Sequence, residues 1–273
     1  MPAPERGYER RPPEREMRTS ELFDLTGKLA IVTGGGGGIG RQMAEGLAEL
    51  GADLVLCSRH LERCQRTAGD LRKLGVRALG LRCDVREPHE VETVVERTRA
   101  EFGRIDVLVN NSGTVWGAAP EDMPLEGWQK VVDVNLTGTF LFSQAAGRVM
   151  IEQGGGKVVN IASVLALTGT RPEIMNAIAY NATKGGILSF TRDLACKWAR
   201  HGIMVNAIAP GWFPSDMSNV VLEKHEAELR ESIPLRRFGG PDDLKGAVAF
   251  LSSAASDYVT GHAIVVDGGQ SAW

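Results

Sequence analysis

The chain has 273 residues, of which 31 are Lys or Arg and 34 are Asp or Glu, so its formal net charge at pH 7 is −3. This balance excludes the strong positive field with which proteins attract nucleic acid or anionic membranes, and it favours a small molecule as the partner. The four cysteines lack the paired spacing of a metal site, and no apolar run reaches the roughly 18 to 20 residues that span a bilayer. We expect a reduced, cytoplasmic protein without a metal site.

The first 21 residues differ in composition from the rest. Four prolines alternate there with Arg and Glu, and the segment has too little apolar surface to pack. We predict a mobile tail over residues 1–21, followed by a single dinucleotide-binding domain over residues 22–273. The acidic residues in the tail argue against an organelle transit peptide.

The first regular element is a strand over residues 29–33, which leads into a run of five glycines and then into a helix predicted over residues 41–50. This junction brings unpaired backbone N–H groups and the positive end of the helix dipole to one point, and the absent Cβ atoms let a pyrophosphate approach. A glycine run alone would also serve as a flexible linker, but the apolar strand and the helix favour the phosphate site. The predicted phosphate-binding residues are Gly34, Gly38, Ile39 and Gly40.

The second predicted strand, residues 53–57, ends at Ser58 and Arg59 and not at an acidic residue. In a dinucleotide-binding fold the tip of this strand meets the adenosine ribose, where an acid binds the 2′-hydroxyl of NAD and an Arg accommodates the 2′-phosphate of NADP. A guanidinium matches a phosphate with paired hydrogen bonds. These residues predict NADP as the cofactor, with NAD less favoured; the alternative is that Arg59 is a solvated loop residue.

Helices and strands then alternate along the chain. Helices are predicted over residues 60–74 and 87–102, and further strands over residues 76–81, 105–109, 157–161, 203–208 and 263–266. The alternation predicts a Rossmann-type α/β fold, a three-layer sandwich with a seven-stranded parallel sheet whose ligands collect at the carboxyl ends of the strands. Two of these ends carry residues that we expect to border the adenosine, namely Asp84, Val85, Asn111 and Gly113.

A long apolar helix is predicted over residues 123–153, and another helix begins near Tyr180. The first contains Asn135, whose amide needs hydrogen-bonding partners if it is buried. Tyr180 and Lys184 share one face of the second, where a positive charge favours the phenolate. Considered alone, such a pair is more often a helix surface pair than a proton-transfer site. Ser163 follows the fifth strand, at the edge where ligands collect.

These motifs occur in one order along the chain: Thr33–Gly40, Asn110–Gly113, Asn135, Ser163, Tyr180-x-x-x-Lys184 and Pro210-Gly211. In this conjunction residues 22–273 resemble the short-chain dehydrogenase/reductase family. The segments 22–28 and 210–217 resemble most closely the branch that contains 3-oxoacyl-acyl-carrier-protein reductases and gluconate 5-dehydrogenase-like proteins. The resemblance implies an enzyme that transfers a hydride between NADP(H) and a secondary alcohol or ketone, such as a 3-oxoacyl thioester or a sugar acid.

The resemblance also implies a role for each catalytic side chain. Tyr180 would be the acid/base, and Ser163 would orient the substrate oxygen. Lys184 would bind the nicotinamide ribose and lower the pKa of Tyr180, and Asn135 would hold a water molecule that relays protons. Tyr180 and Lys184 would therefore contact the cofactor as well.

Three further residues, and the assembly, are implied in the same way. Pro210 and Gly211 would line the cofactor site, and Ser215 stands where the family usually has a Thr that holds the nicotinamide carboxamide. The resemblance further implies a homotetramer in which the helices of residues 123–153 and 180–200 pack on their symmetry mates.

The sequence leaves the substrate open. Ser163 and Tyr180 are 17 positions apart, about four more than in many family members, and the insertion lies within residues 165–179, where the substrate enters. It argues against carrying over the substrates of the fatty-acid reductases. Residues 212–237 are a candidate substrate lid. Predicted pocket residues are Trp116, Leu165, Met175, Trp212 and Met217, and the arginines that could meet a carboxylate or phosphate are Arg171, Arg236 and Arg237.

A second function is compatible with this fold, namely a non-catalytic dinucleotide-binding sensor or scaffold. A binder could lose Tyr180 or Lys184 without consequence. The presence of all four catalytic residue types in the expected order therefore favours the enzyme.

Overall fold

The computed structural model describes residues 16–273, so the predicted tail lies outside the described residues except for its last six positions. A short helix, α1 (Thr19–Leu22), begins within these positions and lies against the 3₁₀ turn Ala254–Ser256. In the part of the chain that the structure describes, no helix is long and apolar enough to cross a membrane.

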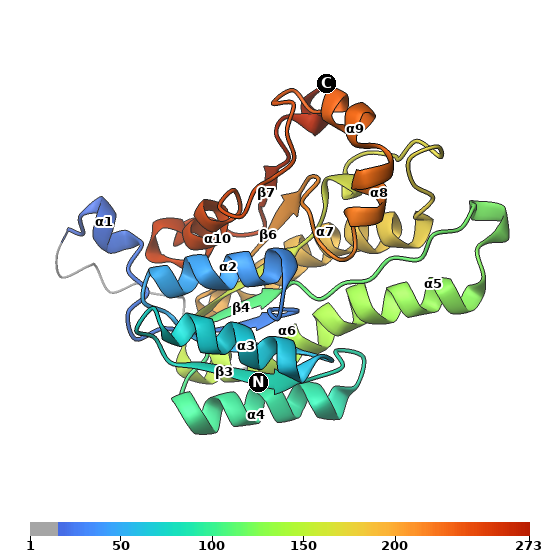
Figure 1. The fold of residues 1–273 in the computed structure, drawn as a ribbon. Helices are drawn as coiled ribbons and strands as arrows, with labels where there is room; N and C mark the ends of the chain where they lie inside the picture. The colour runs from blue at the N-terminus through green and yellow to red at the C-terminus, as the bar shows by residue number, and fades with distance from the viewer. Residues whose placement is uncertain (1–15) are drawn as a thin grey trace.

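Seven parallel strands form one sheet in the order β3-β2-β1-β4-β5-β6-β7, which confirms the predicted architecture (Figure 1). The chain runs outward from β1 to β3 and then in the opposite direction from β4 to β7. The order therefore reverses between β1 and β4, the place where doubly wound folds open a crevice at the carboxyl edge of the sheet. The strands are β1 (Leu29–Thr33), β2 (Asp53–Ser58), β3 (Ala78–Arg82), β4 (Val107–Asn110), β5 (Gly156–Ile161), β6 (Ile203–Pro210) and β7 (Ala263–Val266).

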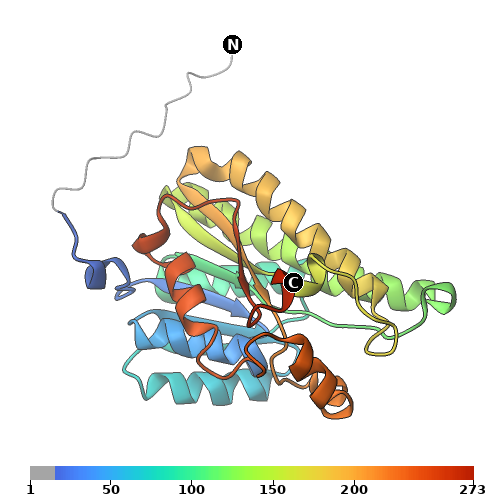
Figure 2. The same cartoon turned by 90° about the horizontal axis from the view of Figure 1, so that it is seen from above.

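Helices cover both faces of the sheet (Figures 1 and 2). The core on one face is formed with α2, α3 and α10, and the core on the other face with α4, α6 and α7. The two central strands β1 and β4 are buried along their whole length, which explains why they read as continuous apolar runs and not as alternating ones. The helices are α2 (Gly38–Glu49), α3 (Leu61–Arg72), α4 (Pro88–Phe102), α5 (Leu125–Val132), α6 (Gly138–Gln153), α7 (Ile178–Trp198), α8 (Asn219–Lys224), α9 (Glu226–Ser232) and α10 (Lys245–Ser252).

The long helix predicted over residues 123–153 is not uniform. It consists of α5 and α6 joined by one wide turn, a π-helix over Asp133–Thr137 that contains Asn135. Such turns break the α-helical hydrogen-bond register and are frequent at functional sites. The candidate lid of residues 212–237 likewise contains two short helices, α8 and α9, which separate at His225.

Candidate active site

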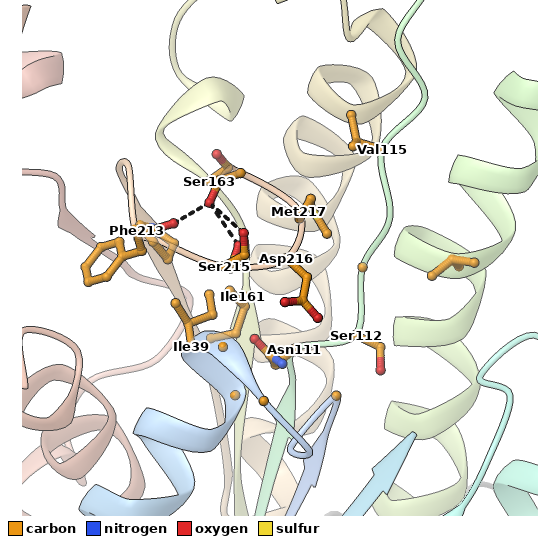
Figure 3. Close-up of a pocket in the computed structure, with 18 of the residues that line it drawn as sticks. Ile39, Asn111, Ser112, Val115, Ile161, Ser163, Phe213, Ser215, Asp216 and Met217 are labelled. Atoms are coloured by element: carbon orange, nitrogen blue, oxygen red, sulfur yellow. Dashed lines mark hydrogen bonds between the residues drawn. The ribbon is translucent and has the colours of Figure 1, made fainter. Parts of the chain in front are cut away.

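A cavity of about 350 Å³ opens at the carboxyl edge of the sheet and is lined by residues that follow β1 to β6. Figure 3 shows residues from the glycine turn, from the β4 end and from residues 213–217 facing the same space. The fold brings every predicted cofactor-binding residue to this wall, and Ser163, Tyr180 and Lys184 as well. Asn135 is the one predicted catalytic or cofactor-binding residue that does not line it.

The glycine turn has the backbone that its sequence suggested, but the helix begins earlier than predicted. Gly34 and Gly38 have φ values of +67° and +53°, which side chains with a Cβ rarely adopt. Helix α2 begins at Gly38 and not at residue 41, so Gly38, Ile39 and Gly40 form its first turn. A Cβ on Gly37 would meet nothing within 4 Å, because this residue borders open cavity. The N–H groups of the first turn therefore face a space that a pyrophosphate could fill.

Arg59 lines the cavity at the tip of β2 beside Ser58. No described residue makes an ion pair or hydrogen bond with the Arg59 guanidinium, and the Ser58 hydroxyl accepts a hydrogen bond from the backbone N–H of His60 at 3.1 Å. A carboxylate on this wall, Asp84, is held by Arg86, whose guanidinium lies 2.7 Å from it and depresses its pKa, with a smaller contribution from the charge of Arg59. The guanidinium of Arg59 is thus available to an anion.

The end of β4 is tied to the end of β1 by side chains. The backbone N–H groups of Asn111 and Ser112 both donate to the Thr33 hydroxyl at 2.9 Å, and the Asn111 amide donates to the Thr33 carbonyl at 2.9 Å. A Cβ on Gly34 would lie 2.7 Å from this amide nitrogen. Asn111 therefore fixes the width of the crevice at the switch between β1 and β4.

Ser163 and Tyr180 meet on the wall beyond the β5 end. Ser163 is 6 % exposed, and its hydroxyl accepts a hydrogen bond from the backbone N–H of Leu165 at 3.2 Å. Burial raises the pKa of the Tyr180 phenol above its usual value, and a hydrogen bond with Ser163 opposes this rise. The expected lowering of the Tyr180 pKa is therefore not found, because desolvation outweighs the favourable contact. A phenol with a raised pKa keeps its proton at neutral pH.

Lys184 lies one turn further along α7 and is 3 % exposed. Its ammonium donates to the carbonyl of Ile161 at 2.6 Å and lies 5.5 Å from the centre of the Tyr180 ring. Burial lowers the pKa of Lys184 to about 8. A Cβ on Gly113 would lie 3.8 Å from the Lys184 nitrogen, so the loop after β4 passes close to this charge.

Asn135 is fully buried in the π-turn, and its side-chain amide is bonded to the protein. The amide oxygen accepts from the backbone N–H of Thr114 at 2.8 Å, and the two N–H groups donate to the Thr114 carbonyl at 3.0 Å and to the Thr183 hydroxyl at 3.1 Å. Asn135 thus ties the loop after β4 to α7, beside Lys184. A relay water would have to bond to an Asn135 oxygen, because both amide N–H groups are taken.

The insertion and the lid form one small apolar cluster. Ile174 from the insertion is buried against Leu222 of α8 and Leu229 of α9. Met175 and Trp212 pack at the edge of this cluster and line the cavity. Leu165 and Met217 also line the cavity, as predicted.

Two predictions for the substrate end are wrong. Trp116 does not line the cavity, because its ring packs on Gly127 of α5 and lies 5.2 Å from the Lys130 ammonium. The three arginines proposed to meet an anion are engaged elsewhere: Arg171 pairs with Glu228 at 2.8 Å, Arg237 with Asp243 at 2.5 Å, and Arg236 donates to the Glu231 carbonyl at 2.5 Å.

Comparison with known proteins places the chain among oxidoreductases. A family model described as Enoyl-(Acyl carrier protein) reductase matches residues 34–271. The 2-dehydro-3-deoxy-D-gluconate 5-dehydrogenase of Escherichia coli (strain K12) is 40 % identical over 250 residues, which cover 90 % of this chain and 96 % of that protein. A short-chain type dehydrogenase/reductase from Mycobacterium marinum is 39 % identical, with a TM-score of 0.88 over 91 % of this chain and 97 % of its own. The chain belongs to the short-chain dehydrogenase/reductase family.

A further member of this family has been solved with ligands. The gluconate 5-dehydrogenase from Burkholderia cenocepacia J2315 in complex with NADP and tartrate is 36 % identical, with a TM-score of 0.89 over 94 % of this chain and all of that one. Among residues 16–273 no cluster of three or more His, Cys, Asp or Glu could hold a metal ion.

Sequence reasoning missed two parts of the site. Thr183 links Asn135 to α7, because its hydroxyl accepts from Asn135 and donates to the Tyr180 carbonyl at 2.9 Å. Arg63 and Asp216 both line the cavity and form an ion pair at 2.5 Å between α3 and the lid. The available signal for the second was the position of Arg63, four residues after Arg59 and in the first turn of the helix predicted from residue 60.

Proposed function

We propose that the chain is an NADP(H)-dependent oxidoreductase that interconverts a secondary alcohol and a ketone through Tyr180, Ser163, Lys184 and Asn135. One observation carries this proposal. A single cavity has a glycine turn and an arginine without an ion-pair partner near one end, and a half-buried tyrosine with a buried serine and lysine near the other. This arrangement suits a dinucleotide whose reactive ring lies beside a proton donor.

The residues of the second end would act on the substrate oxygen. When bound, NADPH supplies the hydride, and negative charge develops on the carbonyl oxygen. Tyr180 and Ser163 would donate hydrogen bonds to this oxygen and stabilise it more than they stabilise the ketone. Tyr180 would then release its proton to it, a contribution of about 10² to 10⁴ in rate for general acid catalysis. The raised pKa of Tyr180 means that the phenol carries its proton at neutral pH before the transfer, as reduction requires.

Lys184 and Asn135 would support that step. The Lys184 ammonium would bind the nicotinamide ribose and thereby hold the cofactor beside Tyr180. Asn135 would position Thr114 and Thr183 around Lys184 through the hydrogen bonds of its amide. Ser215, which lines the cavity opposite Gly38, would hold the nicotinamide carboxamide.

NADP is favoured over NAD by the tip of β2. Arg59 lines the cavity without a protein partner, and the solved relative from Burkholderia cenocepacia is described as a complex with NADP. A 2′-phosphate would give Arg59 a paired partner, whereas a 2′-hydroxyl would not. We expect kcat/KM with NADPH to exceed that with NADH by at least about tenfold, the value of one charge-assisted contact. A better rate with NADH would contradict the assignment.

We also propose that the protein is a homotetramer. Helices α5, α6 and α7 leave large apolar side chains on the surface, namely Leu125, Phe140, Ile151 and Ile178. Phe140 and Phe190 form an edge-to-face pair between α6 and α7, with ring centres 6.5 Å apart. Exposed apolar side chains on neighbouring helices are typical of a surface that a second copy covers.

Turnover separates this proposal from a sensor or scaffold. The absorbance of NADPH is followed with a panel of uncharged ketones, 3-oxoacyl thioesters and keto sugar acids, and NADPH binding is measured by fluorescence. We expect NADPH consumption that depends on the protein with at least one class. Tight NADPH binding without turnover of any class would instead support the sensor.

A further inference from the structure

The wall of the cavity is unevenly charged. Three of its four basic side chains, Arg59, His60 and Arg63, come from the tip of β2 and the beginning of α3. Strand β2 is three strand spacings from β5 in the sheet, about 14 Å at the usual separation of strands. Arg59 and His60 therefore belong to the adenosine end and lie far from Ser163, which follows β5, whereas Arg63 reaches the lid and is paired there with Asp216.

The wall around the reacting end is mainly apolar. Beyond Ser163 and Tyr180 it includes the uncharged hydroxyls of Ser215 and Ser218, and six apolar side chains from the loop after β4, the insertion and the lid: Val115, Leu165, Met175, Trp212, Met217 and Val221. The fourth basic residue, Lys184, already donates to the Ile161 carbonyl. The one charged side chain that the lid contributes to the wall is an acid, Asp216.

No arginine of the insertion or lid turns toward this end. Arg171 is held by Glu228 on the outside of α9, and Arg237 is held by Asp243. Arg230 pairs with Glu226 at 2.8 Å. Each of these guanidiniums has a carboxylate partner within the protein, and none of them lines the cavity.

The apolar wall is also firmly built. Ile174, Leu222 and Leu229 are each at most 8 % exposed and join the insertion to both lid helices. The ion pair of Arg171 with Glu228 closes the same contact on its outer side. The positions of Met175 and Trp212 at the edge of this cluster are therefore fixed by its packing. The insertion supports the lid and faces the substrate with a methionine.

A carboxylate would be poorly held at this end. A charge transferred to apolar surroundings without a partner is strongly disfavoured, and carboxylates in binding sites are normally met by arginine or lysine. The indole N–H of Trp212 is buried without a partner among the described residues, and a single neutral donor of this kind suits an uncharged oxygen. Apolar groups on the substrate would instead gain from burial against the wall.

Resting on the proposed function, we propose that the substrate is a ketone or secondary alcohol with uncharged, apolar groups around the reacting carbon, and not a sugar acid. Two proteins to which this chain is similar are named for gluconate derivatives. The proposal for this chain rests on the wall that its own insertion and lid build.

A matched pair of ketones tests this directly. Ethyl acetoacetate and acetoacetate have the same reacting carbonyl and differ in that one is an ester and the other a carboxylate. We expect kcat/KM with NADPH to be at least about twentyfold higher for the ester, since an unpaired buried charge costs more than a factor of ten. A third substrate, 5-dehydro-D-gluconate, should resemble acetoacetate.

Two matched variants place a cation on the insertion. Met175→Arg brings it to the cavity wall, and Leu167→Arg places it on an exposed residue of the same segment that does not line the cavity. Met175→Arg should lower the preference for the ester at least tenfold, and Leu167→Arg should leave it within twofold. NADPH affinity, measured by fluorescence, should stay within threefold in both, which shows that the cofactor end is intact.

The outcomes separate this inference from the function on which it rests. A wild-type preference for acetoacetate or 5-dehydro-D-gluconate would overturn the inference and leave the oxidoreductase in place. An unchanged ester preference in folded Met175→Arg would also overturn it. If no ketone is reduced while NADPH binds, the proposed function fails, and this inference fails with it. If Met175→Arg does not fold, the wild-type ratio decides.

Discussion

The buried ammonium of Lys184 lowers the stability of the folded chain. Its ammonium is 3 % exposed, and its pKa of about 8 lies below the 10.5 of a free lysine because burial disfavours the charged form. A difference of this size corresponds to about 3 kcal/mol of unfavourable burial at neutral pH. We infer that the charge is kept for the cofactor ribose and not for folding.

The pH dependence of unfolding tests this cost. Between pH 8 and 10.5 the unfolded chain binds the Lys184 proton more strongly than the folded chain, so folded-state stability rises with pH in this window. Relative to Lys184→Met, the wild type should therefore gain about 2 kcal/mol in free energy of unfolding between pH 7 and pH 10, measured in urea. Lys197→Met, an exposed lysine on the same helix, is the control. If the free energy of unfolding changed with pH in the same way in wild type and Lys184→Met, the Lys184 ammonium would not be destabilised by burial.

The residues at strand ends were predictable from sequence, because a parallel sheet places every carboxyl end at one edge. Gly34, Arg59 and Ser163 line the cavity for this reason. The sequence indicated that Asn135 is an amide that needs hydrogen-bonding partners. It did not identify Thr114 and Thr183 as these partners, because they lie 21 and 48 positions away and contact Asn135 only in the folded chain. Trp116 was misplaced because an aromatic residue after a strand end packs on a nearby glycine as readily as on a ligand.

At the scale of elements, the ion pair of Arg63 with Asp216 links α3 to the lid beside the glycine turn. A Cβ on Gly36 would lie 3.0 Å from the Arg63 Cβ, and one on Gly38 would lie 3.4 Å from the Ser215 Cβ. Both sides of the ion pair therefore rest on the turn where the pyrophosphate is proposed to bind. We expect this link to slow the departure of the cofactor.

Loss of the link should show in the release of NADPH. Asp216→Asn should raise the NADPH dissociation rate by about threefold to fivefold, since an exposed ion pair contributes up to about 1 kcal/mol. The rate is measured by displacement in stopped-flow fluorescence. Asp193→Asn removes an exposed ion pair of α7 away from the cavity and should change nothing. Equal release rates for both variants would mean that the lid is not held at this point.

Element ends were predicted to within three residues, and the errors have physical causes. Glycine is a poor helix former, so residues 38–40 were predicted to belong to the turn. In the structure they form the first turn of α2. The π-turn in residues 133–137 could not be predicted, because the spacing of apolar residues across it is the same as in one continuous helix. The insertion was visible as a difference in length, but its contact with α8 and α9 depends on the tertiary fold.

At the scale of the whole molecule, substitutions on the exposed face of α6 and α7 test whether the protein is a tetramer. Phe140 is 45 % exposed and forms an edge-to-face pair with Phe190. Wild-type protein should elute and scatter light as a tetramer, and Phe140→Glu should shift it to smaller species, because a buried charge at an apolar interface is unfavourable. Arg148→Glu, at an exposed position of α6 that faces Glu92 of α4, is the control. A wild-type monomer would exclude the assembly.

The sheet order places the proton-handling end and the phosphate-binding end of one cavity on opposite sides of the β1–β4 switch, so the account depends on both ends acting on one cofactor. Tyr180→Phe separates them most directly, because it removes one oxygen at the substrate end and leaves the glycine turn untouched. Reduction of the preferred ketone under single-turnover conditions is measured together with NADPH binding. We predict a loss in rate of at least about 10³, within the range of general acid catalysis, with NADPH affinity changed by less than threefold. Retention of the wild-type rate in Tyr180→Phe would contradict the mechanism.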